Sequence, residues 1–282
     1  RQLGLVPSAL TYRVRQIEDA LDVLLFDRSA RQARATEAGV ELLREGARLL
    51  TDIGAVAYRI QRVATGWEPH FTIAVDGPIS PHAMLDLADA FYSQAPPTQL
   101  KLRDEILTGT LEALISGRAD LAIGVSVNTS SAAGLQQDVL GEIDFVFVVA
   151  PQHPLAQAPE PLSDASLLLH RAIAVADSAQ GSGDSMGLLN GQPVFTGGWM
   201  RAKLHARLRG LGCGFLPEPM ARPYLAAGLL VSRQLARPSG SIRLHYVWNR
   251  TPATQGGRAL QWWLAQLQHP TTRAALLNHY HF

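Results

Sequence analysis

A proline-free stretch at residues 36–65 is the feature that most restricts how this 282-residue chain can fold. Its apolar positions alternate spacings of four and three, at Leu42, Gly46, Leu49, Ile53, Val56, Ile60 and Val63. This spacing predicts one long helix with a single apolar seam, and about 30 residues at 1.5 Å each would form a rod of roughly 45 Å. Thr36 is expected to cap the helix, and Glu37 lies near the positive end of its dipole. A lone seam needs a partner, so we expect a dimerisation helix; a long helix lying on its own domain is the less favoured alternative.

A shorter helix pattern precedes the rod. Pro7 suits its first turn, and the apolar residues recur every three or four positions at Leu10, Val14, Ile17, Leu21 and Leu25. The segment that follows is short and polar, and its arginines at 28, 31 and 34 fit a two-stranded wing that lies on phosphates. On composition alone, an ordinary amphipathic surface helix with scattered arginines would explain this stretch more often.

The charge of the chain is unevenly distributed. The formal net charge is only +1, which argues against a protein that coats nucleic acid broadly. Residues 1–35 hold six arginines against four acids, whereas residues 67–282 hold fifteen basic and sixteen acidic groups. A basic module on a neutral body indicates a protein that docks one module on DNA and leaves the rest in solvent.

Bulk composition indicates a globular chain with two or three domains, since 47% of the residues are hydrophobic and 17% are charged. Cys213 is the single cysteine, which excludes an internal disulfide and favours the cytoplasm. No apolar run approaches the ~18 residues of a membrane span, and no leader pattern opens the chain. The chain begins without Met and in the middle of a motif, so we expect that an N-terminal segment with a bracing helix is missing.

Short apolar strands alternate with helices after residues 67–70, where Trp, Glu, Pro and His interrupt the rod. Strands are expected at 71–75, 100–105, 119–125, 145–150, 172–175, 193–196, 213–216 and 242–248, and helices at 84–92, 110–116, 163–169 and 201–209. This alternation predicts two small α/β lobes on mostly parallel sheets. The tail at 271–282 has no assigned role.

The ordered motifs resemble the LysR-type transcriptional regulator family. In the N-terminal part the matching residues are Ala9-Leu10-Thr11, Val14, Ile17-Glu18, Leu21, Leu25-Phe26, Arg28 and Thr36-Glu37-Ala38-Gly39. Residues 117–124, 148–155 and 210–217 match landmarks of the family's effector domain in the expected order. The chain departs from the family pattern at Val6, Pro7, Ser8 and Tyr12, so base preference cannot be transferred.

The resemblance implies a fold and a domain order. The expected class is α/β with an N-terminal all-α winged helix-turn-helix, and two Rossmann-like lobes of the type 2 periplasmic-binding-protein kind after a long linker helix. The expected domains are a partial DNA-binding domain at 1–35, the linker helix at 36–66 and the effector domain at 67–282. Within the latter, lobe I would comprise about 67–143 and 249–282, and lobe II about 144–248. Residues 258–268 would form the helix that returns to lobe I.

The resemblance also implies partners and DNA contacts. A homodimer, extending to a tetramer, would read an interrupted inverted repeat in double-stranded DNA and could contact RNA polymerase, with no role for a membrane. The expected DNA-binding residues are Ser8, Ala9, Thr11, Tyr12, Arg13, Arg15, Arg28, Ser29, Arg31 and Arg34. Among them, the polar residues of the helix would approach base edges and the arginines would hold phosphates.

A small-molecule effector is expected between the lobes, at the carboxyl ends of the strands. The candidate residues are Asp76, Ile79, Ser80, Thr108, Gly124, Val125, Thr196, Gly198, Phe215 and Pro217. Ser80 and Thr108 are equally well explained as helix caps. The apolar rim favours an apolar or aromatic metabolite.

Signals for other chemistry are weak. Cys213 among glycines is better explained as a small buried strand residue than as a nucleophile. The glycine spacings do not match a dinucleotide fingerprint, and His279 and His281 are better explained as an exposed tail than as metal ligands. We therefore expect no catalytic residues, no metal site, no cofactor and no enzyme activity. The rival interpretation is a small-molecule-binding protein or enzyme on the same two-lobe scaffold.

Overall fold

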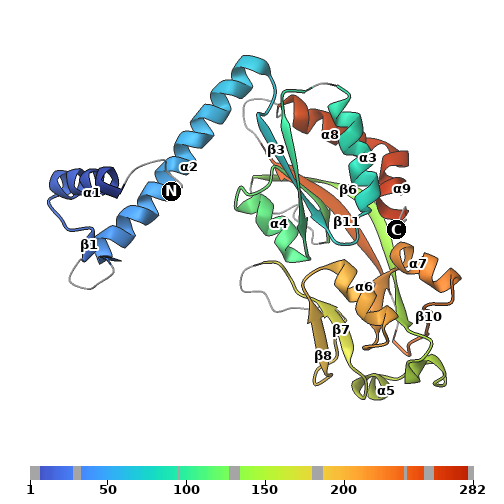
Figure 1. Cartoon of the computed structure of the whole chain (residues 1–282). Helices are drawn as coiled ribbons and strands as arrows, with labels where there is room; N and C mark the ends of the chain where they lie inside the picture. The colour runs from blue at the N-terminus through green and yellow to red at the C-terminus, as the bar shows by residue number, and fades with distance from the viewer. Residues whose placement is uncertain are drawn as a thin grey trace. The chain divides into compact units, whose positions relative to one another are not determined.

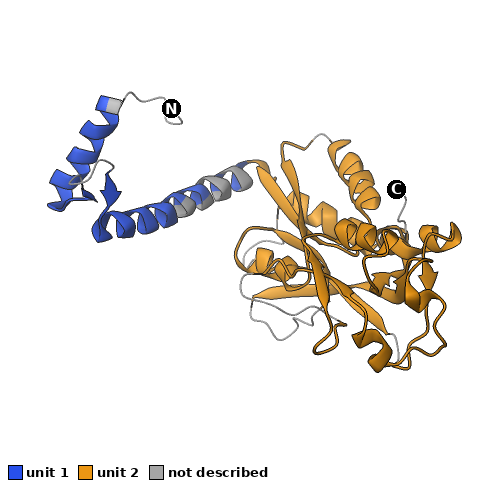
Figure 2. Cartoon of the chain, turned by 60° about the horizontal axis from the view of Figure 1, so that its bottom comes forward, with its two compact units in different colours: residues 1–64 blue, residues 65–282 orange. Residues whose placement is uncertain are grey.

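Two compact units make up the chain, residues 1–64 and residues 65–282 (Figure 2). The computed structural model describes residues 7–27, 33–94, 96–126, 134–179, 187–237, 240–250 and 257–278. None of the helices in these ranges has the length and apolar character needed to span a membrane.

The described residues of the first unit form two helices and a small two-stranded ribbon. In chain order its elements are α1 (Pro7–Leu21), β1 (Phe26–Asp27), β2 (Arg34–Ala35) and α2 (Glu37–Thr65) (Figure 1). Strands β1 and β2 pair antiparallel. The predicted short helix, wing and long helix are therefore all present.

Three motif residues hold the wing between the two helices. The buried carboxylate of Glu18 accepts hydrogen bonds from the backbone N–H groups of Leu25, at 2.8 Å, and Phe26, at 3.2 Å. Thr36 caps α2, since its Oγ1 accepts from Gly39 N at 3.1 Å, and it donates to Leu24 O at 2.7 Å. A Cβ at Gly39 would collide with the carbonyl group of Leu25. The acid, the threonine and the glycine thus fix where the chain enters α2.

Apolar side chains of the first unit are mostly exposed. On α1, Leu10, Ile17 and Leu21 are exposed, and Leu25 is the one buried hydrophobic residue among the described residues of this unit. The predicted seam of α2 is also open to solvent, at Leu42, Leu49, Ile53, Val56, Ile60 and Val63. The unit therefore presents two apolar stripes that its described residues leave open to solvent.

The second unit is built on two long strands, β6 (Leu135–Val149) and β11 (Ser241–Asn249), which cross from one lobe to the other (Figure 1). The first lobe adds β3 (His70–Asp76), α3 (Pro81–Tyr92), β4 (Gln99–Glu105), α4 (Thr108–Ile115), β5 (Leu121–Val125), α8 (Arg258–Gln268) and α9 (Pro270–Asn278). The second lobe adds η1 (Pro154–Ala156), α5 (Asp164–Leu168), β7 (Ala172–Val175), β8 (Val194–Gly197), α6 (Met200–Leu208), β9 (Gly214–Pro217), α7 (Glu218–Ala226) and β10 (Val231–Ser232).

The main sheet has the strand order β10-β6-β11-β5-β3-β4, with β9 also paired to β6. Strand β3 runs parallel to β4 and β5, and β7 runs parallel to β8. The other pairs of the main sheet are antiparallel. The α/β class and the two lobes are as predicted, but the expectation of mostly parallel sheets fails for the crossing strands, which return through the sheet in the opposite direction.

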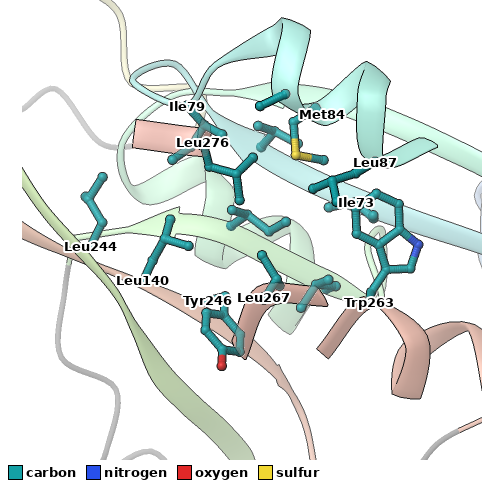
Figure 3. Packing of buried hydrophobic residues seen from close by; sticks show 14 of the residues in the cluster. Ile73, Ile79, Met84, Leu87, Leu140, Leu244, Tyr246, Trp263, Leu267 and Leu276 are labelled. Atoms are coloured by element: carbon teal, nitrogen blue, oxygen red, sulfur yellow. The ribbon is translucent and has the colours of Figure 1, made fainter. Parts of the chain in front are cut away.

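The largest core fills one face of the first lobe. Helices α3, α8 and α9 pack on the sheet there, and Phe71, Phe91, Tyr246 and Trp263 are its largest buried members (Figure 3). The tail at 271–282, for which the sequence predicted no role, contributes to this core, because Leu276 and Leu277 of α9 are buried in it. Helix α9 also supports the strand-to-helix turn before α3, where Ser80 N donates to Leu276 O at 2.8 Å.

Candidate ligand cleft and nucleic-acid interface

A cavity of about 340 Å³ lies between the two lobes, above the crossing strands. Its lining is mainly apolar, and polar groups enter it from both sides. The first lobe contributes Asp76, Pro78, Ile106, Leu107 and Ser126, the crossing strands and the segment before β11 contribute Phe145, Gly240, Ser241, Ile242 and Leu244, and the second lobe contributes Ala174, Val175, Gly187, Met200, Lys203, Phe215 and Arg237. A space of this size and lining suits a small organic molecule with few polar groups.

A second cavity of about 460 Å³ adjoins the first. Asp76, Ile106 and Met200 line both cavities and therefore stand between them. The second cavity is further lined by α3 and β4 of the first lobe and by the start of α6, including Ile79, Trp199 and Arg201.

Asp76 closes the end of β3 at the first-lobe wall. Its Oδ1 accepts hydrogen bonds from Gly77 N and Leu107 N, both at 2.9 Å. Burial raises the pKa of this carboxyl to about 7, against the lowering effect of those two hydrogen bonds. Leu107 has a φ of 54°, a left-handed conformation that a branched side chain seldom adopts. Asp76 thus holds a strained turn at the mouth of the cavity.

The two lobes are joined beside the cavity by a loop that follows β7. Asp177 accepts from the Oγ1 of Thr108 at 2.6 Å, from Thr108 N at 3.4 Å and from Gly109 N at 3.1 Å. A carboxylate of the second lobe thereby caps helix α4 of the first lobe. Partial burial raises the pKa of Asp177, but these hydrogen bonds and one from Ala179 N outweigh it and hold that pKa below its ordinary value.

Ser178 extends this connection. Its hydroxyl donates to Glu105 Oε2 at 2.7 Å and accepts from Ile106 N at 2.9 Å. A Cβ at Gly109 would collide with the Ser178 hydroxyl, so only glycine allows this approach. Glu105 is buried and also pairs with Arg103 at 2.9 Å. The two lobes therefore meet through a hydrogen-bonded acidic network.

The second-lobe wall is basic and less fully paired. Lys203 and Arg207 lie one turn apart on α6 and are both buried. Arg207 donates from Nη2 to Ile173 O at 3.0 Å, but its Nε and Nη1 have no partner among the described residues. Arg237 is engaged, since it donates to Gly187 O at 3.2 Å and lies 3.6 Å from Asp164 Oδ1.

Four of the ten predicted effector residues lie at a cavity or at the junction between the lobes. Asp76 and Phe215 line the first cavity, and Ile79 lines the second. Thr108 is bonded to the other lobe.

The other six have different surroundings. Ser80 is fully buried and caps α3 by accepting from Ala83 N at 3.2 Å. Val125 and Pro217 are buried strand residues, and Thr196 and Gly198 are exposed around the end of β8. Gly124 has a φ of 97°, and a Cβ there would meet Asp76 and Ile79 at 3.3 Å or less. Its small size therefore lets the first-lobe wall pack closely.

The predicted DNA-contacting residues of α1 form an exposed polar face. Ser8, Thr11, Tyr12, Arg13 and Arg15 are exposed, and Ala9 is half-buried. The Tyr12 hydroxyl accepts from Gln16 Nε2 at 3.3 Å. Arg34 is exposed on the wing, whereas Arg28, Ser29 and Arg31 lie outside the described residues.

Comparison with known protein families identifies the two units of the chain. Residues 64–270 match the family model of the LysR substrate binding domain, and residues 1–40 match that of the bacterial regulatory helix-turn-helix protein of the lysR family. The chain belongs to the LysR family. This LysR-family protein is a DNA-binding transcriptional regulator with an effector-binding domain.

Curated relatives agree with this membership. The chain is 34% identical over 258 residues to YeeY, an uncharacterized HTH-type transcriptional regulator of Escherichia coli K12, with 91% of this chain and 82% of the relative covered. It is 35% identical over 269 residues to YhaJ, a probable HTH-type transcriptional regulator of the same strain, with 94% and 88% covered.

Solved structures show the same fold. The full-length Vibrio cholerae virulence activator AphB aligns with a TM-score of 0.61 at 20% identity, covering 94% of this chain and 90% of that one. LysG of Corynebacterium glutamicum with bound effector Arg aligns with a TM-score of 0.55 at 22% identity, covering 99% and 92%.

Several residues at the cleft of this LysR-family regulator were absent from the sequence-based prediction, notably Lys203, Arg237, Asp177 and Ser178. The strand-end rule would have found the last two, because they follow β7 directly. Lys203 lies inside a helix with other basic residues, and no sequence signal distinguished it. Cys213 is buried as expected, and burial raises its pKa to about 11, so the thiolate form is disfavoured.

Proposed function

We propose that the cavity between the lobes binds the effector and that occupancy changes how far the lobes close. The observation that carries this proposal is the hydrogen-bonded junction at the cavity edge, where Asp177 and Ser178 of one lobe bond to the start of α4 and the end of β4 of the other. A ligand that fits better with the junction closed than with it open would shift the population of the two states. The regulator would act by binding alone, in the cytoplasm, without a catalytic step.

The exposed seam of α2 would pair two subunits. Six apolar side chains spaced along this 29-residue helix lie in solvent, and burying them against a second copy would remove that apolar area from water. A two-fold dimer would present two α1 helices to the half-sites of an interrupted inverted repeat. Tetramer formation and contact with RNA polymerase are the further assemblies we infer for this regulator.

The α1 face would supply base contacts and the wing would supply phosphate contacts. Thr11 lies centrally on the exposed polar face of α1, and Arg34 is an exposed cation on β2. The two positions should therefore affect DNA binding in different ways.

The test compares Thr11→Ala and Arg34→Ala on DNA that the wild-type protein selects from a random library, and on random duplexes. Arg34→Ala should weaken binding to both DNAs alike and lower the slope of log K against log salt concentration by about 1. Thr11→Ala should weaken binding mainly to the selected DNA, by about 1 kcal/mol. Fluorescence anisotropy over a salt series measures both effects, with Arg243→Ala, an exposed arginine of β11, as the control. Unchanged affinities in both variants would contradict the assigned DNA surface.

A further inference from the structure

The chain contains only two lysines, and they lie in opposite environments. Its 25 basic residues are otherwise all arginine. Lys101 is exposed on β4, whereas the side chain of Lys203 lines the cavity between the lobes and the residue is only 8% exposed. Within the part of the chain that the structure describes, the Lys203 ammonium has neither an ion pair nor a hydrogen bond.

Among the described residues, the basic neighbours of Lys203 add positive charge to its surroundings. Arg207, the next residue along the same face of α6, is fully buried and is bonded to a backbone carbonyl only. Arg237 is held by Asp164 and Gly187, and its guanidinium lies over the ring of Phe215 at 5.8 Å. The acid that lines the cavity, Asp76, is engaged with the backbone N–H groups of Gly77 and Leu107.

An unpaired ammonium at this depth is unfavourable for the empty protein. Burial, with Arg207 as the smaller cause, lowers the pKa of Lys203 to about 7. An apolar side chain of the same length would fill the space without that cost, since a buried charge without a partner is expensive. Stability alone therefore does not explain a lysine at this position of a mainly apolar cavity.

We propose that Lys203 binds the carboxylate of the effector, and that the effector is an organic monoacid whose apolar body packs on Phe145, Phe215, Leu244 and Met200. This inference rests on the proposed function, since it names the chemical class of the molecule held in the cleft. The negative group supplies the missing partner of the buried cation, and the cavity volume of about 340 Å³ accommodates an acid with one ring or a short chain.

The first test pairs acids with their neutral amides. Phenylacetate and phenylacetamide, and hexanoate and hexanamide, are titrated against the full chain while the thermal midpoint is followed. For wild-type protein each acid should bind at least tenfold more tightly than its amide. Lys203→Met should remove this preference, and Lys101→Met, the matched exposed lysine, should keep it. Lys203→Met should also raise the thermal midpoint of the ligand-free protein, because it removes a buried charge.

The second test observes the two lysines directly. With ¹³C-labelled lysine the side-chain spectrum contains two sets of signals, and Lys203→Met identifies its own set by its loss. Adding phenylacetate should move the Lys203 signals and raise the pH at which they titrate, whereas phenylacetamide should leave that pH unchanged. The Lys101 signals should not respond to either molecule.

Failure of the carboxylate assignment differs from failure of the cleft itself. Equal stabilisation by acid and amide, persisting in Lys203→Met but lost on filling the cavity with Ala174→Leu, would overturn the role of Lys203 and leave the cleft as the effector site. An acid preference that survives in Lys203→Met, or no stabilisation of the wild-type protein by either acid, would overturn the proposal. If the wild-type protein bound DNA with no preference for any sequence, the proposed function itself would be wrong.

Discussion

The junction between the lobes and helix α6 both hold charged side chains at the cleft, but the two regions differ in how these charges are paired. At the junction between the lobes, Asp76, Glu105 and Asp177 each accept hydrogen bonds from identified donors. On α6, Lys203 has no hydrogen bond or ion pair among the described residues. Arg207 is bonded to one carbonyl through Nη2, and its Nε and Nη1 have no partner there. The acidic groups are satisfied by the protein itself, whereas the basic groups are not.

This difference separates structural charge from charge available to a ligand. A buried polar group that has all its hydrogen bonds holds elements together, and removing its partner is costly. A buried charge without a partner lowers stability until something binds to it. Removing a hydrogen-bonding side chain of the junction, such as Asp177 or Ser178, should therefore lower stability, whereas removing the charge of Lys203 should raise it. Asp76 differs from the other junction residues, because its buried carboxyl costs stability once it ionises.

The largest expected effect is at Asp76. Its folded-state pKa of about 7 exceeds the ordinary value of 3.8, so the folded protein holds the proton more tightly than the unfolded chain. The protonated carboxyl therefore contributes its full stability below about pH 4. As pH rises through 7 this contribution is lost, and the free energy of unfolding falls by about 3–4 kcal/mol. Asp76→Asn keeps an oxygen for Gly77 N and Leu107 N and has no charge to bury.

Denaturant unfolding between pH 4 and 8 measures this effect. Asp76→Asn should lose less stability with rising pH than the wild-type protein and should be the more stable of the two at pH 8. Asp104→Asn, an exposed acid of β4, serves as the control and should follow the wild-type profile. Parallel profiles for Asp76→Asn and wild type would show that Asp76 is not a buried titrating group.

A smaller effect is expected at Asp177, which connects the lobes. Asp177→Ala removes the bonds to Thr108 and Gly109, and because this carboxylate is partly exposed we expect a loss of about 1–2 kcal/mol. Its pKa lies below the ordinary value, so the contribution is present at neutral pH and is lost as pH falls through that lowered pKa.

A double-mutant cycle with Thr108→Val at pH 7 isolates the bond between the lobes. Coupling of at least 0.5 kcal/mol is expected. The control is Asp86→Ala, which removes an exposed acid of α3 and should change stability little. Additive effects of Asp177→Ala and Thr108→Val would mean that the two side chains do not hold the lobes together.

Local patterns predicted elements well and contacts poorly. The spacing of apolar residues located α1 and α2, and the polar arginine-spaced segment located the wing, because helix periodicity and turn chemistry are properties of adjacent residues. Helix α9 was missed, since its two buried leucines are adjacent and leave no helical period.

The cleft was only partly predictable for the same reason. Thr108 was expected at a helix start facing the cleft, but its partner Asp177 lies 69 positions away in the chain, and only the fold brings them together. Lys203 carries no local sign of its burial, because a lysine between arginines on a short helix is typical of an exposed face. Burial and pairing depend on tertiary packing, which spacing does not encode.

The smallest effect is expected at Ser178. Its direction is informative, because Ser178→Ala should lower stability and Lys203→Met should raise it. Ser178→Ala removes a donor to Glu105 Oε2 and an acceptor for Ile106 N, which should cost about 1 kcal/mol because Glu105 keeps its pair with Arg103. Ser93→Ala, at the exposed end of α3, is the matched control and should cost less. The midpoint of thermal unfolding should therefore be lower than wild type for Ser178→Ala and higher than wild type for Lys203→Met, although both substitutions remove a polar group at the same cleft. Equal destabilisation of both variants would mean that Lys203 stabilises the folded protein as Ser178 does. The proposed difference between α6 and the junction would then be wrong.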